Sequence, residues 1–127
     1  MFIQTNPNPH GLVVDDCSVR AISIALDESW DYVYMWLCVY GFMAGDMPGS
    51  KKVVGKFLKD RGFRRFVIPD TCPDCYTVRD FCRENQNGTF ILATSSHVVA
   101  VIDGDYYDAW DSGDEVPMLV WRRESNA

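Results

Sequence analysis

The sequence predicts an α+β domain in which N-terminal helices pack on a C-terminal antiparallel sheet. In the first half of the chain, apolar residues recur at the spacing of three or four that is typical of helices. After Gly62 the pattern changes to short apolar segments separated by turn residues, which is typical of strands. No repeat and no polar linker interrupts the 127 residues, so we expect a single domain spanning 1–127.

Four segments combine helical periodicity with a capping residue. They span residues 17–26, 30–43, 51–60 and 78–84, with Asp16, Ser29, Ser50 and Thr77 as N-caps. Residues 1–14 should be extended, because the segment Asn6-Pro7-Asn8-Pro9 disfavours a helix. The second helix is apolar almost throughout, so we expect it to be largely buried.

Five segments show strand signals, at residues 64–68, 89–94, 97–102, 106–110 and 118–122. The third and fourth should form a hairpin around Asp103-Gly104-Asp105. If all three residues form the loop, His97 lies opposite Asp111. If only Asp103 and Gly104 form it, His97 lies opposite Trp110, and Asp108 is on the same face of the sheet as His97.

Composition and charge limit the classes of function. The hydrophobic content of 47% argues against disorder, and no apolar run reaches the roughly 20 residues of a membrane span. The N-terminus lacks a signal-peptide pattern, so we expect a cytoplasmic protein, and the five cysteines should be reduced thiols. The net charge of −6 argues against a generic nucleic-acid binder. We interpret the basic residues between Lys51 and Arg65 as a solvated helix face.

Cys17 carries the strongest functional signal. It opens the first predicted helix, where free backbone N–H groups and the helix dipole favour the thiolate, which is the nucleophilic form. His97 begins an apolar strand 80 residues later, and the carboxylates Asp108 and Asp111 follow. These side chains can serve as nucleophile, general base and orienting group. We expect a catalytic triad of Cys17, His97 and Asp111, because Ser112-Gly113 follows Asp111 in a way that resembles the small turn after the orienting residue of papain-like enzymes.

Several further residues are candidates for the same cleft. Asn6 and Asn8 precede Cys17 and are candidate binding residues, and Trp110 could either cover the Cys–His pair or lie in the core. His10 is an alternative base. We expect no metal and no cofactor. The segment Cys72-Pro73-Asp74-Cys75 lacks the second cysteine pair that structural zinc usually has, and it does not begin a helix as a redox pair would.

The chain resembles a family of small papain-like proteins from phages, prophages and Gram-positive bacteria. The resemblance covers nearly the whole chain and depends on residues 16–22, 47–51, 97–104 and 106–113. The order Cys, His, carboxylate is also that of papain-like hydrolases. The resemblance implies a papain-like cysteine hydrolase core, in which the Cys helix packs on the sheet that carries the His.

A more distant resemblance is to the peptidases that cleave double-glycine leaders from bacteriocins. Their motif residues correspond to Asp16, Cys17, His97 and Asp111. That family has a Gln six residues before its Cys, as a donor to the oxyanion, and this chain has Gly11 there. The remaining candidate donors are the backbone N–H of Cys17 and the side chains of Gln4, Asn6, Asn8 and His10.

Together, these features predict a cysteine hydrolase, peptidase or isopeptidase-like, that acts on a peptide or protein substrate through a Cys-His-Asp triad. The alternative is a phage-encoded binding module, or an inhibitor of a host protein, that uses the same fold without catalysis. A deamidase or transferase would use the same Cys–His pair. We expect no nucleic-acid partner and no membrane partner, and we expect the host cytoplasm as the location if a phage encodes the protein.

Overall fold

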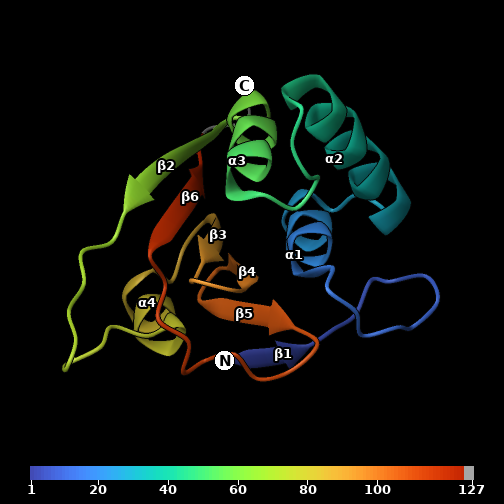
Figure 1. Cartoon of the computed structure of the whole chain (residues 1–127). Coiled ribbons are helices and arrows are strands. Elements are labelled where there is room, and N and C mark those ends of the chain that lie inside the picture. Colours follow the sequence, from blue (N-terminus) through green and yellow to red (C-terminus); the bar gives the residue numbers. More distant parts are fainter. Residues whose placement is uncertain (125–127) are drawn as a thin grey trace.

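The computed structural model describes residues 1–124, so the last three residues of the predicted domain 1–127 lie outside it. Within this range the chain forms four helices and a six-stranded sheet (Figure 1). The helices are α1 (Cys17–Leu26), α2 (Trp30–Ala44), α3 (Lys51–Asp60) and α4 (Val78–Glu84). The strands are β1 (Phe2–Gln4), β2 (Phe63–Val67), β3 (Thr89–Ala93), β4 (Val98–Ile102), β5 (Asp105–Asp108) and β6 (Leu119–Arg123). The predicted α+β class is confirmed.

The sheet has the strand order β1-β5-β4-β3-β6-β2. Every neighbouring pair is antiparallel except β1 and β5, which are parallel. The sequence predicted extended backbone for residues 1–14 but did not predict that Phe2–Gln4 would join the sheet. None of the described helices is both long enough and apolar enough to cross a membrane.

Helices cover both faces of the sheet, as Figure 1 shows, with α1, α2 and α3 on one side and α4 on the other. The alternation of side chains along β3 explains how one strand serves two cores. Ile91 and Ala93 pack with residues of α1, α2 and α3, whereas Phe90 and Leu92 pack with residues of α4. Because both faces are covered, β3 and β4 are nearly continuous apolar runs.

Three of the four predicted N-caps form capping hydrogen bonds. The hydroxyls of Ser29, Ser50 and Thr77 accept from backbone N–H groups in the first turns of α2, α3 and α4. Asp16 precedes α1 as predicted, but its side chain makes no capping bond. Its carboxylate instead accepts hydrogen bonds from Arg20 and from the indole N–H of Trp30. The first turn of α1 is therefore not capped by its predicted residue.

The prediction that α2 is largely buried is wrong. Only Val33, Leu37 and Gly41 are buried, because α2 packs on α1 and α3 along one side, and no helix or strand among residues 1–124 covers its other side. Phe42 and Met43 are 85% and 79% exposed. The apolar residues that the sequence placed in the core thus form an outward face of α2.

The cysteines also differ from expectation. The sequence predicts reduced thiols, but the loop between β2 and α4 folds back so that Cys72 and Cys75 form a disulfide, with their Cα atoms 4.2 Å apart. Cys17, Cys38 and Cys82 are free.

Candidate active site

The structure brings Cys17 and His97 together at one end of the sheet. Cys17 is the first residue of α1, and His97 directly precedes β4, against which α1 packs. The ring nitrogen Nε2 of His97 lies 2.5 Å from Oδ2 of Asp108, the last residue of β5. Cys17 and His97 line the same cleft, and interaction with the His97 side chain lowers the pKa of the Cys17 thiol. The Nε2 atom of His97 is therefore occupied by a carboxylate, and Nδ1 is the ring nitrogen left for the thiol.

The electrostatic environment favours a charged Cys–His pair. Burial raises the pKa of the Cys17 thiol, but hydrogen bonds from His97 and from the Val98 backbone N–H outweigh it and lower the pKa below its ordinary 9.0. Burial lowers the pKa of His97, but hydrogen bonds with Asp108 and Cys17 outweigh it and raise the pKa to about 9. Both directions favour a thiolate beside an imidazolium.

Asp108 is held as a carboxylate by its neighbours. Its side chain is buried, which by itself raises the pKa, but hydrogen bonds from His97 and Ser112 lower it below the ordinary value. The Ser112 hydroxyl donates to Oδ2 at 2.6 Å, and the backbone N–H of Ala109 donates to Oδ1 at 2.8 Å. These hydrogen bonds favour the charged form of the carboxylate and fix it in place.

The predicted pairing of His97 with Asp111 is wrong. The β4–β5 hairpin has the two-residue turn, in which Ile102 pairs with Asp105. Asp103 and Gly104 both have positive φ, which a tight hairpin turn of this length favours. The Asp111 carboxylate instead accepts from the Tyr106 hydroxyl and from the Gly113 backbone N–H.

The same register explains the position of Trp110. Continuing the pairing of β4 with β5 by three residues brings Trp110 opposite His97, and their ring centroids are 4.7 Å apart. Trp110 is partly exposed, so it covers the imidazole from the solvent side and is not a core residue. The sequence left open whether Trp110 covers the Cys–His pair or lies in the core. In the structure Trp110 lies over the His97 ring.

The sequence analysis did not identify Arg20 as part of the site. Its guanidinium is buried and bridges two acids, pairing with Asp16 through Nη1 and lying 3.5 Å from Oδ1 of Asp108 through Nη2. Asp16 in turn accepts from Asn8 and Trp30. A single Arg on an otherwise uncharged helix, about one turn after Cys17, was the signal that could have indicated this network.

A cleft of about 440 Å³ opens at the Cys17 thiol. Its walls come from the start of α1, from α2, from the loop before α3 and from the turn before β4; they include Asp15, Cys17, Ser18, Tyr34, Leu37, Met47, Pro48, Gly49, Ser96 and His97. Asn6, Asn8 and His10 do not line it. The side chain of Asn6 donates to the Leu12 carbonyl, and that of Asn8 donates to Asp16, so both organise the preceding loop.

The start of α1 supplies backbone donors at this cleft. The first intrahelical bond of α1 runs from Arg20 N–H to the Asp16 carbonyl, so the N–H groups of Cys17, Ser18 and Val19 precede it. These three residues all line the cleft. A negatively charged oxygen bound beside the thiol would meet these donors and the positive end of the helix dipole.

Among residues 1–124 there is no group of three or more His, Cys, Asp or Glu side chains that could hold a metal ion. No protein-family model matches the chain, and no curated protein and no solved structure matches it either. The geometry of the site is therefore the basis for the function proposed below.

Proposed function

We propose that the chain is a cysteine hydrolase that cleaves a peptide or isopeptide bond and has a papain-like core. The observation that carries this proposal is that His97 bonds to the Asp108 carboxylate and lines the same cleft as the Cys17 thiol. A structural histidine needs only satisfied hydrogen bonds. It does not need a thiol of lowered pKa at a helix N-terminus beside an open cleft.

The reaction would proceed by covalent catalysis. The Cys17 thiolate attacks the carbonyl carbon, and the carbonyl oxygen takes the electron pair as an oxyanion. The N–H groups at the start of α1 would stabilise this oxyanion, with the Cys17 N–H nearest to the sulfur. The His97 imidazolium then gives its proton to the departing amine, and a thioester on Cys17 remains.

Water completes the cycle. His97, now neutral, takes a proton from water as the hydroxide equivalent adds to the thioester carbonyl. The new acid leaves, and the sulfur departs as thiolate beside the reprotonated His97, so atoms and charge balance. Asp108 is a positioning residue, because it fixes the His97 tautomer and stabilises the imidazolium without touching the substrate.

An acyl-transfer assay tests this proposal. With p-nitrophenyl acetate we expect a burst of one equivalent of p-nitrophenolate per chain and an acetyl group on Cys17 in the mass spectrum. The burst should vanish in Cys17→Ala and slow in His97→Ala, whereas Cys38→Ala is the matched control and should behave as the wild type. An adduct on another cysteine, or an unchanged burst in His97→Ala, would contradict the assignment.

Products from a peptide library then separate the related reactions. Hydrolysis of a backbone bond yields two shorter peptides that together contain one added water. Deamidation instead converts a side-chain amide to an acid without shortening the chain, and transfer yields a product joined to an added amine. Only the first product pattern agrees with a peptidase.

The outward face of α2 favours a second candidate, a binding module that acts on a host protein without catalysis. Phe42, Met43, Met35 and Val39 are exposed on this helix, and exposed apolar patches commonly mark interaction sites. The two functions respond differently to substitution. A hydrolase loses product formation in Cys17→Ala and tolerates Phe42→Ser, whereas a binding module keeps its crosslinks to host proteins in Cys17→Ala and loses them in Phe42→Ser.

A further inference from the structure

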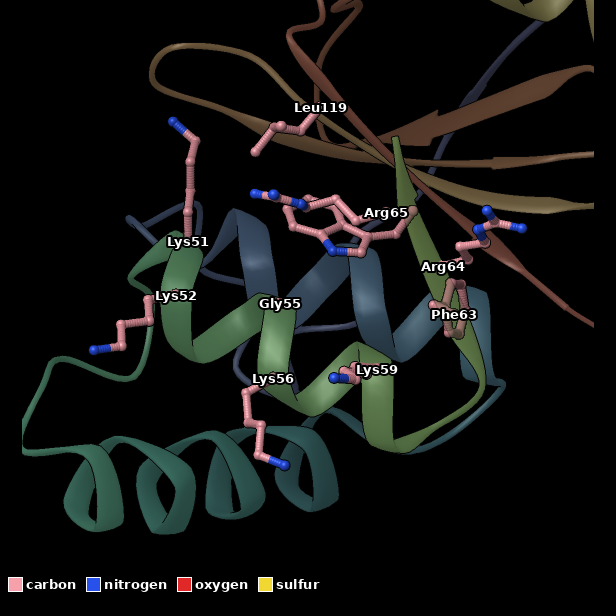
Figure 2. Close-up of a pocket in the computed structure, with 10 residues that line it drawn as sticks. Lys51, Lys52, Gly55, Lys56, Lys59, Phe63, Arg64, Arg65 and Leu119 are labelled. Carbon is pink, nitrogen blue, oxygen red and sulfur yellow. The ribbon is translucent and has the colours of Figure 1, made fainter. Parts of the chain in front are cut away.

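A second cavity, larger than the Cys17 cleft, lies between α3 and the strands β2 and β6 (Figure 2). Its volume is about 650 Å³. We call it the basic groove, because its lining includes Lys51, Lys52, Lys56, Lys59, Arg64 and Arg65. The other lining residues are Gly55, Phe63, Leu119 and Trp121. Figure 2 shows Arg65 extending from β2 over α3 toward Lys51.

The basic groove concentrates positive charge in an acidic chain. It holds six of the 12 Lys and Arg residues of a protein with net charge −6, and no Asp or Glu lines it. Lys56 is paired with Asp60 at 3.1 Å. Among residues 1–124, Lys52, Lys59 and Arg65 form no ion pair. The groove therefore has cations available for an anionic ligand.

The arrangement follows from the periodicity of α3 and the register of the strands. The buried residues of α3 face the core, which leaves its lysines on the opposite side. Arg65 of β2 lies directly across from Trp121 of β6. Gly55 keeps the floor open, because a Cβ at that position would lie 3.6 Å from the Trp121 ring, so a longer side chain would occupy the cavity.

The floor also offers a hydrogen-bond donor. Trp121 is 2% exposed and lines the groove. Its indole N–H donates to no residue among 1–124, yet it is not sealed from the surface. Indole N–H groups usually find a partner when they are buried. An acceptor oxygen of a ligand held by the surrounding cations would supply a hydrogen-bond partner for the Trp121 indole N–H.

The basic groove adjoins the Cys17 cleft. Lys51 lines both cavities. Its Nζ lies 3.3 Å from the carbonyl oxygen of Ser95, two residues before His97. The two cavities therefore meet at Lys51.

We propose that the basic groove binds an acidic segment of the polypeptide whose reacting carbonyl lies at Cys17. This proposal rests on the proposed function and adds the substrate class. The lining residues of α3 run from Lys51 to Lys59, which gives the groove a length of about 12 Å along the helix. At about 3.3 Å per residue, about four extended residues fill that length. Carboxylates suit the lining, because a guanidinium such as that of Arg65 binds a carboxylate through two parallel hydrogen bonds.

An acidic polypeptide fits the groove better than a nucleic acid. Single-stranded nucleic acid is usually bound by exposed aromatic faces on which bases stack. Here both aromatic residues of the lining, Phe63 and Trp121, are buried. The net charge of −6 would also repel a long polyanion that extends beyond the groove.

Fluorescence anisotropy tests the proposal with a fluorescein-labelled hexaglutamate peptide and the Cys17→Ala protein. We expect saturable binding that weakens with added salt and is absent for the hexaglutamine peptide. Arg65→Gln should weaken binding about tenfold through loss of a charge-assisted pair. Arg83→Gln removes the same charge from the exposed surface of α4 and is the matched control, for which we expect no change. Gly55→Leu should also reduce binding by filling the floor.

The outcomes separate this proposal from the proposed function. Absence of hexaglutamate binding, equal binding of hexaglutamine, or equal loss in Arg83→Gln would overturn the acidic-segment proposal even if the acyl burst is present. An oligo-dT of equal charge that binds more tightly and depends on Arg65 would assign the groove to nucleic acid instead. Because binding is measured without the nucleophile, loss of the acyl burst alone would refute the proposed function only.

Discussion

Replacing Asp108 by Asn should lower the pKa of His97, whereas replacing Asp111 should not. In the wild type, burial lowers the pKa of His97, and the hydrogen bond to Asp108 is the largest contribution that raises it, to about 9 from the ordinary 6.5. A hydrogen bond to a charged group contributes about 1.5–3 kcal/mol, and one pKa unit corresponds to about 1.4 kcal/mol. The Asp108→Asn variant should therefore have a His97 pKa between about 7 and 8.

The measurement is an NMR titration of the histidine ring signals. The chain has two histidines, and His10 lies exposed in the loop before α1, so its signal is an internal reference. Because His97 is protonated below its pKa, its signals in Asp108→Asn should move to the neutral position at a lower pH than in the wild type.

Asp111→Asn is the matched control. The carboxylate of Asp111 bonds to the Tyr106 hydroxyl and the Gly113 N–H, and both contacts are away from the imidazole. A His97 pKa that remains at about 9 in Asp108→Asn would refute the proposed role of Asp108. An equal decrease in the two variants would show that net charge, and not the direct hydrogen bond, sets the pKa. Circular dichroism of each variant establishes that the fold is retained.

Three further predictions concern other parts of the site. First, Cys17 should be alkylated at least about tenfold faster than Cys82 near neutral pH, because burial raises the pKa of Cys82 to about 11 while that of Cys17 is lowered. Mass spectrometry of the folded protein measures both rates, and comparable rates would contradict the assignment of the nucleophile. Second, Arg20→Met should destabilise the fold by about 3–5 kcal/mol, because it leaves two buried carboxylates without their cation. A urea denaturation curve with an unchanged midpoint would show that the buried pairs contribute nothing to stability. Third, Trp110→Ala should remove the ring-current shift of the His97 ring protons and cost about 1 kcal/mol. Proton spectra of the two proteins provide the test, and identical His97 shifts would place the indole elsewhere in solution.

The helices could be predicted closely from the sequence because their ends are encoded locally. α1 and α3 have the predicted boundaries, and Ser50 caps α3 through a bond to a residue three positions away. Such signals depend on side chains within one turn and need no distant partner. The pairing of Cys17 with His97 was also predicted. The chain has only two histidines, so few residues compete for the role of partner to a thiol at the start of a helix.

The tertiary structure decided which carboxylate His97 contacts, which face of α2 is covered and where the lysines of α3 gather. The choice between Asp108 and Asp111 depended on one residue of hairpin register, which positive φ at Asp103 and Gly104 sets and which the sequence left open. The apolar pattern of α2 shows that it is hydrophobic but not whether another element covers its second side. The basic groove required β2 and β6 to lie beside α3, a contact between segments distant in sequence. Local patterns are fixed by hydrogen bonds and periodicity within an element, whereas these features depend on how separate elements are placed in space.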